Sequence, residues 1–132
     1  MSHIETVKKF LIGIGDPSIE VMEQAFRDHT ATDMLWTQPG LPECKTIEEN
    51  IGLMRFLQDK TDYASGAIAF LNVQNDGDVV MCERVDTLAK KDGSHWVTVP
   101  VNAVMEMNAD GKIQVWREYF DPTELVSLVP SD

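Results

Sequence analysis

The chain has 132 residues, of which 43% are hydrophobic, and 22 acidic against 11 basic side chains give it a net charge of −11. We expect a single domain over residues 1–132, because a chain of this length can bury a core and enclose a small pocket. The negative charge disfavours nucleic acid and anionic lipid as partners, and no apolar run reaches the ~18 residues that span a bilayer, so we expect a cytoplasmic protein.

Two helices are predicted at the start of the chain. Apolar residues that recur at three- and four-residue steps indicate a first helix that ends near residues 13–15. Asp16 is a good N-cap and Pro17 suits the first helical position, so we expect a second helix to begin there and to run to about His29.

A short strand and a third helix are predicted next. Residues 32–38 form an extended piece, and the sequence Pro-Gly-Leu-Pro at 39–42 indicates a loop. Thr46 and Glu49 then form a capping box, which marks the start of the third helix.

From residue 63 onward the apolar period changes from 3.6 to 2, which indicates strands. Turn signals separate four runs, 67–74, 78–91, 95–107 and 112–120. Asp121 and Pro122 then predict an N-cap and the start of a short C-terminal helix. Helices followed by an antiparallel meander indicate an α+β fold, with the helices packed on one face of a curved sheet.

Two carboxylates fall on otherwise apolar strand faces. Alternation puts Arg84 and Asp86 on one face of the second predicted strand, together with three apolar side chains. In the last strand, Glu118 lies between the large aromatic residues Trp116 and Phe120 on one face. Because a charge is tolerated in an apolar setting only when it is paired, this pattern indicates a buried polar site.

If Arg84, Asp86 and Glu118 meet in a cavity, the guanidinium can hold both carboxylates, and the low dielectric would leave one of them protonated. One protonated and one ionised carboxyl group form an acid–base pair that can open a strained ether without a covalent intermediate. The residues alone leave open a second interpretation, in which the same network only ties strands together.

No metal or cofactor site is predicted. The three histidines and two cysteines stand apart in the sequence, without the spacings of metal-binding motifs. We therefore expect any chemistry to depend on carboxylates, arginine and hydroxyl groups.

The stretches CERVDTL (82–88) and VWREYFD (115–121) resemble the limonene-1,2-epoxide hydrolase family, which belongs to the superfamily of nuclear-transport-factor-2-like and ketosteroid-isomerase-like proteins. The resemblance covers most of the chain. It implies a cone-shaped, curved, mixed or antiparallel sheet, with three N-terminal helices on one face enclosing an apolar pocket. It also implies that Arg84 bridges the two acids, that Asp86 protonates the epoxide oxygen, and that Glu118 is the base that activates water.

The resemblance further assigns the residues that hold the water and the substrate. The family's water-holding Tyr and Asn are matched by Trp36 and Gln38, and its Asp base is matched by Glu118. The expected pocket lining is apolar and consists of Trp36, Leu88, Val99, Val101, Trp116 and Phe120. Such a pocket implies a terpenoid, cyclic or steroid-like epoxide as substrate and a vicinal diol as product.

Other interpretations remain open at this point. A ketosteroid-isomerase-like or polyketide-cyclase-like enzyme would need the same paired carboxyls without a water site, and a ligand-binding domain would need neither. Asp121 is expected to be a helix cap, and not a second base beside Glu118. Met105 and Met107 are expected to pack on the outer face of the sheet, at the contact of a homodimer, a state that the family resemblance also implies.

Overall fold

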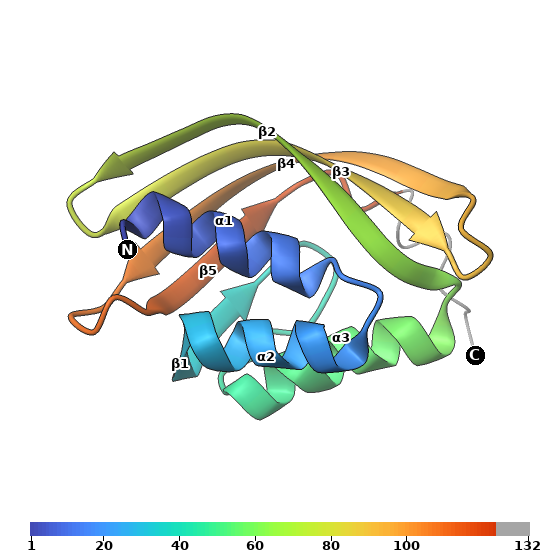
Figure 1. Ribbon diagram of the computed structural model, residues 1–132, viewed down its shortest axis with the longest axis horizontal. Helices are drawn as coiled ribbons and strands as arrows, with labels where there is room; N and C mark the ends of the chain where they lie inside the picture. The colour runs from blue at the N-terminus through green and yellow to red at the C-terminus, as the bar shows by residue number, and fades with distance from the viewer. Residues whose placement is uncertain (124–132) are drawn as a thin grey trace.

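The computed structural model describes residues 1–123, which form three helices and a five-stranded sheet. The elements in chain order are α1 (His3–Ile14), α2 (Ile19–His29), β1 (Thr30–Thr37), α3 (Ile47–Lys60), β2 (Tyr63–Asp76), β3 (Val79–Lys90), β4 (His95–Met107) and β5 (Ile113–Tyr119). All three helices lie on one side of the curved sheet (Figure 1). The predicted α+β fold is therefore confirmed.

The sheet is mixed. Its strand order is β1-β5-β4-β3-β2, in which β1 runs parallel to β5 and every other neighbouring pair is antiparallel. The four-stranded meander is as predicted, with the limits of β3, β4 and β5 within one residue of the expected runs. Strand β2 begins at Tyr63, four residues before the predicted run, because its small residues up to Gly66 also pair with β3.

The start of α2 differs from the prediction. Its N-cap is Ser18, whose hydroxyl accepts a hydrogen bond from the Val21 backbone N–H at 3.3 Å. Asp16 instead accepts a hydrogen bond from the Ser18 backbone N–H at 2.9 Å, so it forms a turn that precedes the cap. The prediction of Asp16 as N-cap and Pro17 as first helical residue was thus wrong by two residues. The cap of α3 is as predicted, since Thr46 accepts from the Glu49 backbone N–H.

The core lies between the helices and the concave side of the sheet. Phe10 of α1 packs edge-on against Phe26 of α2 and Trp116 of β5, with ring centroids 5.2 and 5.0 Å apart. Met105 and Met107 of β4 also belong to this core, with exposed fractions of 0% and 6%. The prediction that they pack on the outer face was wrong, because alternate residues of a strand share a face and these two share theirs with the inward-facing Val101.

The end of α1 is held against β2 by a close contact between two glycines. The Gly66 backbone N–H donates a hydrogen bond to the Gly15 carbonyl at 2.9 Å. A Cβ atom added to Gly15 would lie 2.3 Å from the Gly66 carbonyl oxygen, which is far inside contact distance. The contact therefore requires glycine at position 15.

Across residues 1–123, no helix is both long and apolar enough to cross a membrane.

Replacement of Gly15 by alanine gives a first prediction. Gly15→Ala should lower the free energy of unfolding by roughly 1–3 kcal/mol, since the new methyl group forces α1 away from β2. Gly52→Ala is the matched control: Gly52 lies in α3 and a Cβ there would meet nothing within 4 Å. This control should gain roughly 0.5–1 kcal/mol from its better helix propensity. Urea unfolding measures both changes, and equal stabilities of the two variants would contradict the role of the contact.

Candidate active site

The centre of the candidate site is a buried ion-pair network around Arg84. The Arg84 guanidinium on β3 donates from Nε to Asp86 Oδ1 at 2.9 Å and from Nη2 to Asp86 Oδ2 at 3.2 Å. The same Nη2 donates to Glu118 on β5. The side chains of Arg84 and Glu118 are 4% and 6% exposed, whereas that of Asp86 is 19% exposed. One guanidinium thus holds two carboxylates from two strands.

The register of the antiparallel strands makes this network possible. Arg84 stands opposite Val101 of β4, and Glu118 stands opposite Ala103, the next residue of β4 on the same face. Arg84 and Glu118 are therefore diagonal neighbours across β4. Because Ala103 has only a methyl side chain, the long arginine can reach over it to the carboxylate on β5.

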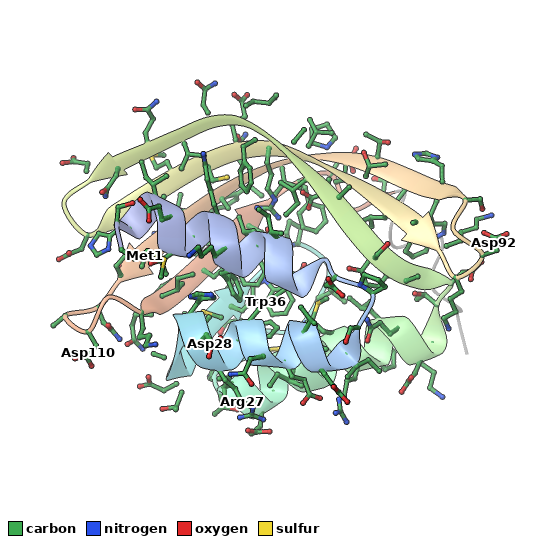
Figure 2. All side chains as sticks on the ribbon, viewed as in Figure 1. Met1, Arg27, Asp28, Trp36, Asp92 and Asp110 are labelled. Atoms are coloured by element: carbon green, nitrogen blue, oxygen red, sulfur yellow. The ribbon has the colours of Figure 1, made fainter. Side chains whose placement is uncertain are left out.

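The parallel pairing of β1 with β5 adds two more predicted residues. It sets Trp36 opposite Trp116, and the two rings stack with centroids 4.4 Å apart and planes 9° from parallel. Glu118 follows Trp116 by two positions on the same face of β5. Gln38 comes directly after the end of β1, and it lines the same cavity as these three residues. Figure 2 shows Trp36 in the layer between the sheet and the helices.

Burial controls the protonation of the network. It raises the pKa of Glu118 above its ordinary value, although the Arg84 guanidinium and, more weakly, the indole of Trp36 act in the opposite direction. Burial also disfavours the charge of Arg84, but the carboxylates of Glu118 and Asp86 outweigh it and raise the pKa of the guanidinium. Arg84 therefore stays charged, while Glu118 is able to exchange a proton at a higher pH than an exposed glutamate.

A cavity of about 160 Å³ opens beside the network. Every site residue predicted from the sequence lines it except Asp86: these are Trp36, Gln38, Arg84, Leu88, Val99, Val101, Trp116, Glu118 and Phe120. Asp86 is joined to Arg84 but is not part of the lining. The structure thus brings the predicted residues together, and the predicted acid is held by Arg84 without being part of the cavity lining.

Several residues of the cavity lining carry buried hydrogen-bond donors that lack acceptors. Within the part of the chain that the structure describes, four buried nitrogen atoms have no hydrogen-bond partner: Arg84 Nη1, Trp36 Nε1, Gln38 Nε2 and Trp116 Nε1. All four residues line the cavity. Trp36 Nε1 is near Glu118 but outside hydrogen-bonding geometry. Since an unpaired buried donor costs roughly 1–3 kcal/mol, this set indicates a site for water or for a ligand that carries oxygen acceptors.

Two further residues clarify the limits of the site. Asp121 is exposed, and its carboxylate accepts a hydrogen bond from the Thr123 backbone N–H at 3.0 Å, the same contact that Asp16 makes with Ser18. The helix predicted after it lies outside the described residues.

Burial raises the pKa of the Cys82 thiol, so the thiol is held in its unreactive, protonated form beside Arg84. Between residues 1 and 123, no three His, Cys, Asp or Glu side chains come together as metal ligands.

Sequence reasoning missed part of the lining. Tyr63 and Trp96 lie on the cavity wall, and α3 contributes Met54 and Leu57. Tyr63 is the first residue of β2 and lies four residues before the predicted run 67–74, so the alternation within that run assigned it to no face. Burial and the charge of Asp86 raise the pKa of its hydroxyl to about 12.

Comparisons with known proteins agree with this architecture. The chain is similar to the structure of an M. tuberculosis LEH-like epoxide hydrolase, with a TM-score of 0.72 and 22% identity over 96% of this chain and 88% of that one. It is also similar to a putative SnoaL-like polyketide cyclase from Jannaschia sp. CCS1 (TM-score 0.76, 19% identity, 98% and 92% covered). A third similar structure is TerC co-crystallized with polyporic acid (TM-score 0.76, 18% identity, 98% of each chain).

These structural similarities show the nuclear-transport-factor-2-like fold. No curated protein sequence matches the chain. The family assignment comes from the sequence itself, because residues 1–130 match the limonene-1,2-epoxide hydrolase catalytic domain. The chain belongs to the limonene-1,2-epoxide hydrolase family.

Proposed function

We propose that this protein is a cofactor-independent epoxide hydrolase that adds water to a small apolar epoxide and releases a vicinal diol. The observation that carries the proposal is the buried Glu118, held by Arg84 at the wall of an apolar cavity among unpartnered N–H donors. A carboxylate in this setting can take a proton from a water molecule at near-neutral pH, because burial raises its pKa toward that range.

The proposed water site uses Glu118, Trp36 and Gln38. A water molecule there would donate one hydrogen to the Glu118 carboxylate and the other to the Gln38 amide oxygen, and it would accept from the Trp36 indole. One lone pair would remain free to attack the substrate. This hydrogen-bonding pattern supports hydrolysis even though tryptophan and glutamine replace the tyrosine and asparagine that the family resemblance implies.

Asp86 is the proposed general acid, and Arg84 is the proposed orienting group. The water oxygen forms a bond to one epoxide carbon, the carbon–oxygen bond breaks, Glu118 takes the proton of the water, and Asp86 supplies a proton to the departing oxygen. A later proton transfer from Glu118 to Asp86 restores both groups. The match of both residues to the family's motif supports this pairing of roles, and the bidentate contact with Arg84 holds the Asp86 carboxyl group in a fixed orientation.

The proposed substrate is an epoxide of a single small ring, within the terpenoid, cyclic or steroid-like class that the family resemblance implies. A cavity of about 160 Å³ is close to the roughly 150 Å³ that accommodates benzene in an apolar protein interior. The cavity size therefore favours a monocyclic epoxide over a steroid. The lining residues Leu88, Val99, Val101, Trp116 and Phe120 would bind its hydrocarbon part.

A second candidate function rests on the placement of Asp86. Because Asp86 does not line the cavity while four unpartnered donors do, the site would also suit proton transfer next to a carbonyl, as in a ketosteroid-isomerase-like or polyketide-cyclase-like enzyme. Glu118 would then be the base, and the donors would stabilise the enolate oxygen. A ligand-binding role without catalysis would use the same cavity.

The homodimer also remains a proposal. The outer face of the sheet exposes large apolar side chains, among them Leu71, Met81 and Tyr119, with exposed fractions of 57%, 57% and 55%. Such a face is suited to a second copy of the chain. Sedimentation that gives only a monomer at micromolar concentration would contradict it.

The central test is hydrolysis in labelled water. With cyclohexene oxide in ¹⁸O-labelled water, the protein should form a diol with one labelled oxygen, detected by mass spectrometry. Glu118→Gln should reduce the rate at least 100-fold, because glutamine cannot take the proton. Glu106→Gln is the matched control, since Glu106 pairs with Arg117 at a more exposed position of the sheet. Without labelled diol, deuterium exchange next to the carbonyl of cyclohexanone would instead support the proton-transfer alternative.

The raised pKa of Glu118 predicts the pH dependence of the reaction. The base must be ionised, so kcat/KM should fall as the pH drops through a midpoint above 4.5, the ordinary value for glutamate. Because the folded pKa is raised, burial of Glu118 favours folding most below pH 4.5, and this contribution is lost as the pH rises through the folded value. The stability of the wild type relative to Glu118→Gln should therefore decline over that window. A midpoint at or below 4.5 would contradict the assignment.

Asp86→Asn separates a catalytic from a structural role for the acid. The variant should lose roughly 100- to 10,000-fold in turnover, because asparagine supplies no proton. Its fold should persist, since the amide oxygen can still accept from Arg84. Steady-state kinetics and thermal unfolding measure the two effects. A lowered melting temperature with unchanged activity per folded molecule would show that Asp86 only ties the strands together.

A further inference from the structure

Tyr63 is a cavity residue to which the proposed mechanism gives no role. It is the first residue of β2, directly after α3, and its side chain is 8% exposed. Its backbone N–H donates to the Thr61 hydroxyl at 3.1 Å, and its ring lies 6.3 Å from that of Trp96, another lining residue. The residue is thus fixed at both its backbone and its ring.

The hydroxyl of Tyr63 is available to a ligand. No hydrogen bond joins it to the rest of residues 1–123, and burial and the charge of Asp86 are the two causes of its raised pKa. It therefore stays protonated and can act as a donor. A Cβ atom added to Gly66 would lie 3.7 Å from the hydroxyl oxygen, and Gly66 stands opposite Leu88, another lining residue, in the pairing of β2 with β3.

Tyr63 carries the sole hydroxyl among the described residues that line the cavity. Asp86 acts on it electrostatically yet does not reach the lining itself. Tyr63 therefore adds a hydroxyl group to the lining residues near the proposed acid, which is not itself one of them.

We propose that the Tyr63 hydroxyl donates a hydrogen bond to the oxygen atom of the bound substrate. This inference deepens the proposed function and rests on it, since it names the group that contacts the epoxide oxygen. Glu118 and its water would then act on the ring carbon, while Tyr63 holds the oxygen. The hydroxyl would select ligands with an oxygen acceptor over hydrocarbons of the same shape.

The test uses two probes of similar shape that carry no epoxide, cyclohexanone and methylenecyclohexane, of which the first has an oxygen acceptor. The three tryptophans of the chain all line the cavity, so their indole signals in ¹⁵N NMR spectra report binding of either probe. Tyr63→Phe should weaken cyclohexanone binding roughly fivefold to tenfold, the size of one neutral hydrogen bond, and change methylenecyclohexane binding by less than twofold.

Tyr119→Phe is the matched control, because Tyr119 is the other tyrosine of the chain and is 55% exposed. This control should leave the affinity for both probes unchanged. Equal weakening of both probes by Tyr63→Phe would show a packing role alone, and no weakening of either would show that the hydroxyl makes no contact; either result overturns the inference. The test needs no turnover, so a failure of epoxide hydrolysis is recognised separately in the ¹⁸O experiment.

Discussion

The buried guanidinium of Arg84 is the constraint on which the site depends. An ion removed from water loses several kcal/mol of solvation, and only close opposite charges with good hydrogen-bond geometry offset this loss. Arg84 obtains them from Asp86 on its own strand and from Glu118 on β5. The network therefore requires that β3, β4 and β5 keep one register, and the small Ala103 between them keeps the path open.

The same network sets the chemistry of the cavity. One cation faces two carboxylates, and burial makes the ionised form of Glu118 costly, which raises the pKa of this residue above its ordinary value. The other polar atoms around it are mostly donors: two indoles, an amide and the free nitrogen of Arg84. A site of this kind suits a water molecule or a ligand oxygen, and it leaves the remaining wall apolar enough to bind a hydrocarbon ring.

Local patterns predicted most of the fold because they depend on neighbouring residues. Alternation and turn residues gave the limits of β3, β4 and β5 to within a residue, and the capping box located the start of α3. The errors arose where two local solutions compete. Asp16 and Ser18 are both residue types that cap helices well. In the structure Ser18 is the N-cap of α2, and Asp16 forms the turn before it. The small residues at the start of β2 have no apolar period, so pairing with β3 alone makes them a strand.

Strand alternation and motif spacing predict that Arg84 and Asp86 share a strand face, that Glu118 lies between aromatic residues, and that the chain resembles the family to which it belongs. The packing of distant segments places β1 parallel to β5, which stacks Trp36 on Trp116 and brings Gln38 and Glu118 to the wall of one cavity. It also decided that Tyr63 reaches the cavity wall while Asp86 does not. The physical reason is that a local period fixes the face on which a side chain lies, whereas strand neighbours and the depth of a side chain depend on how distant segments pack together.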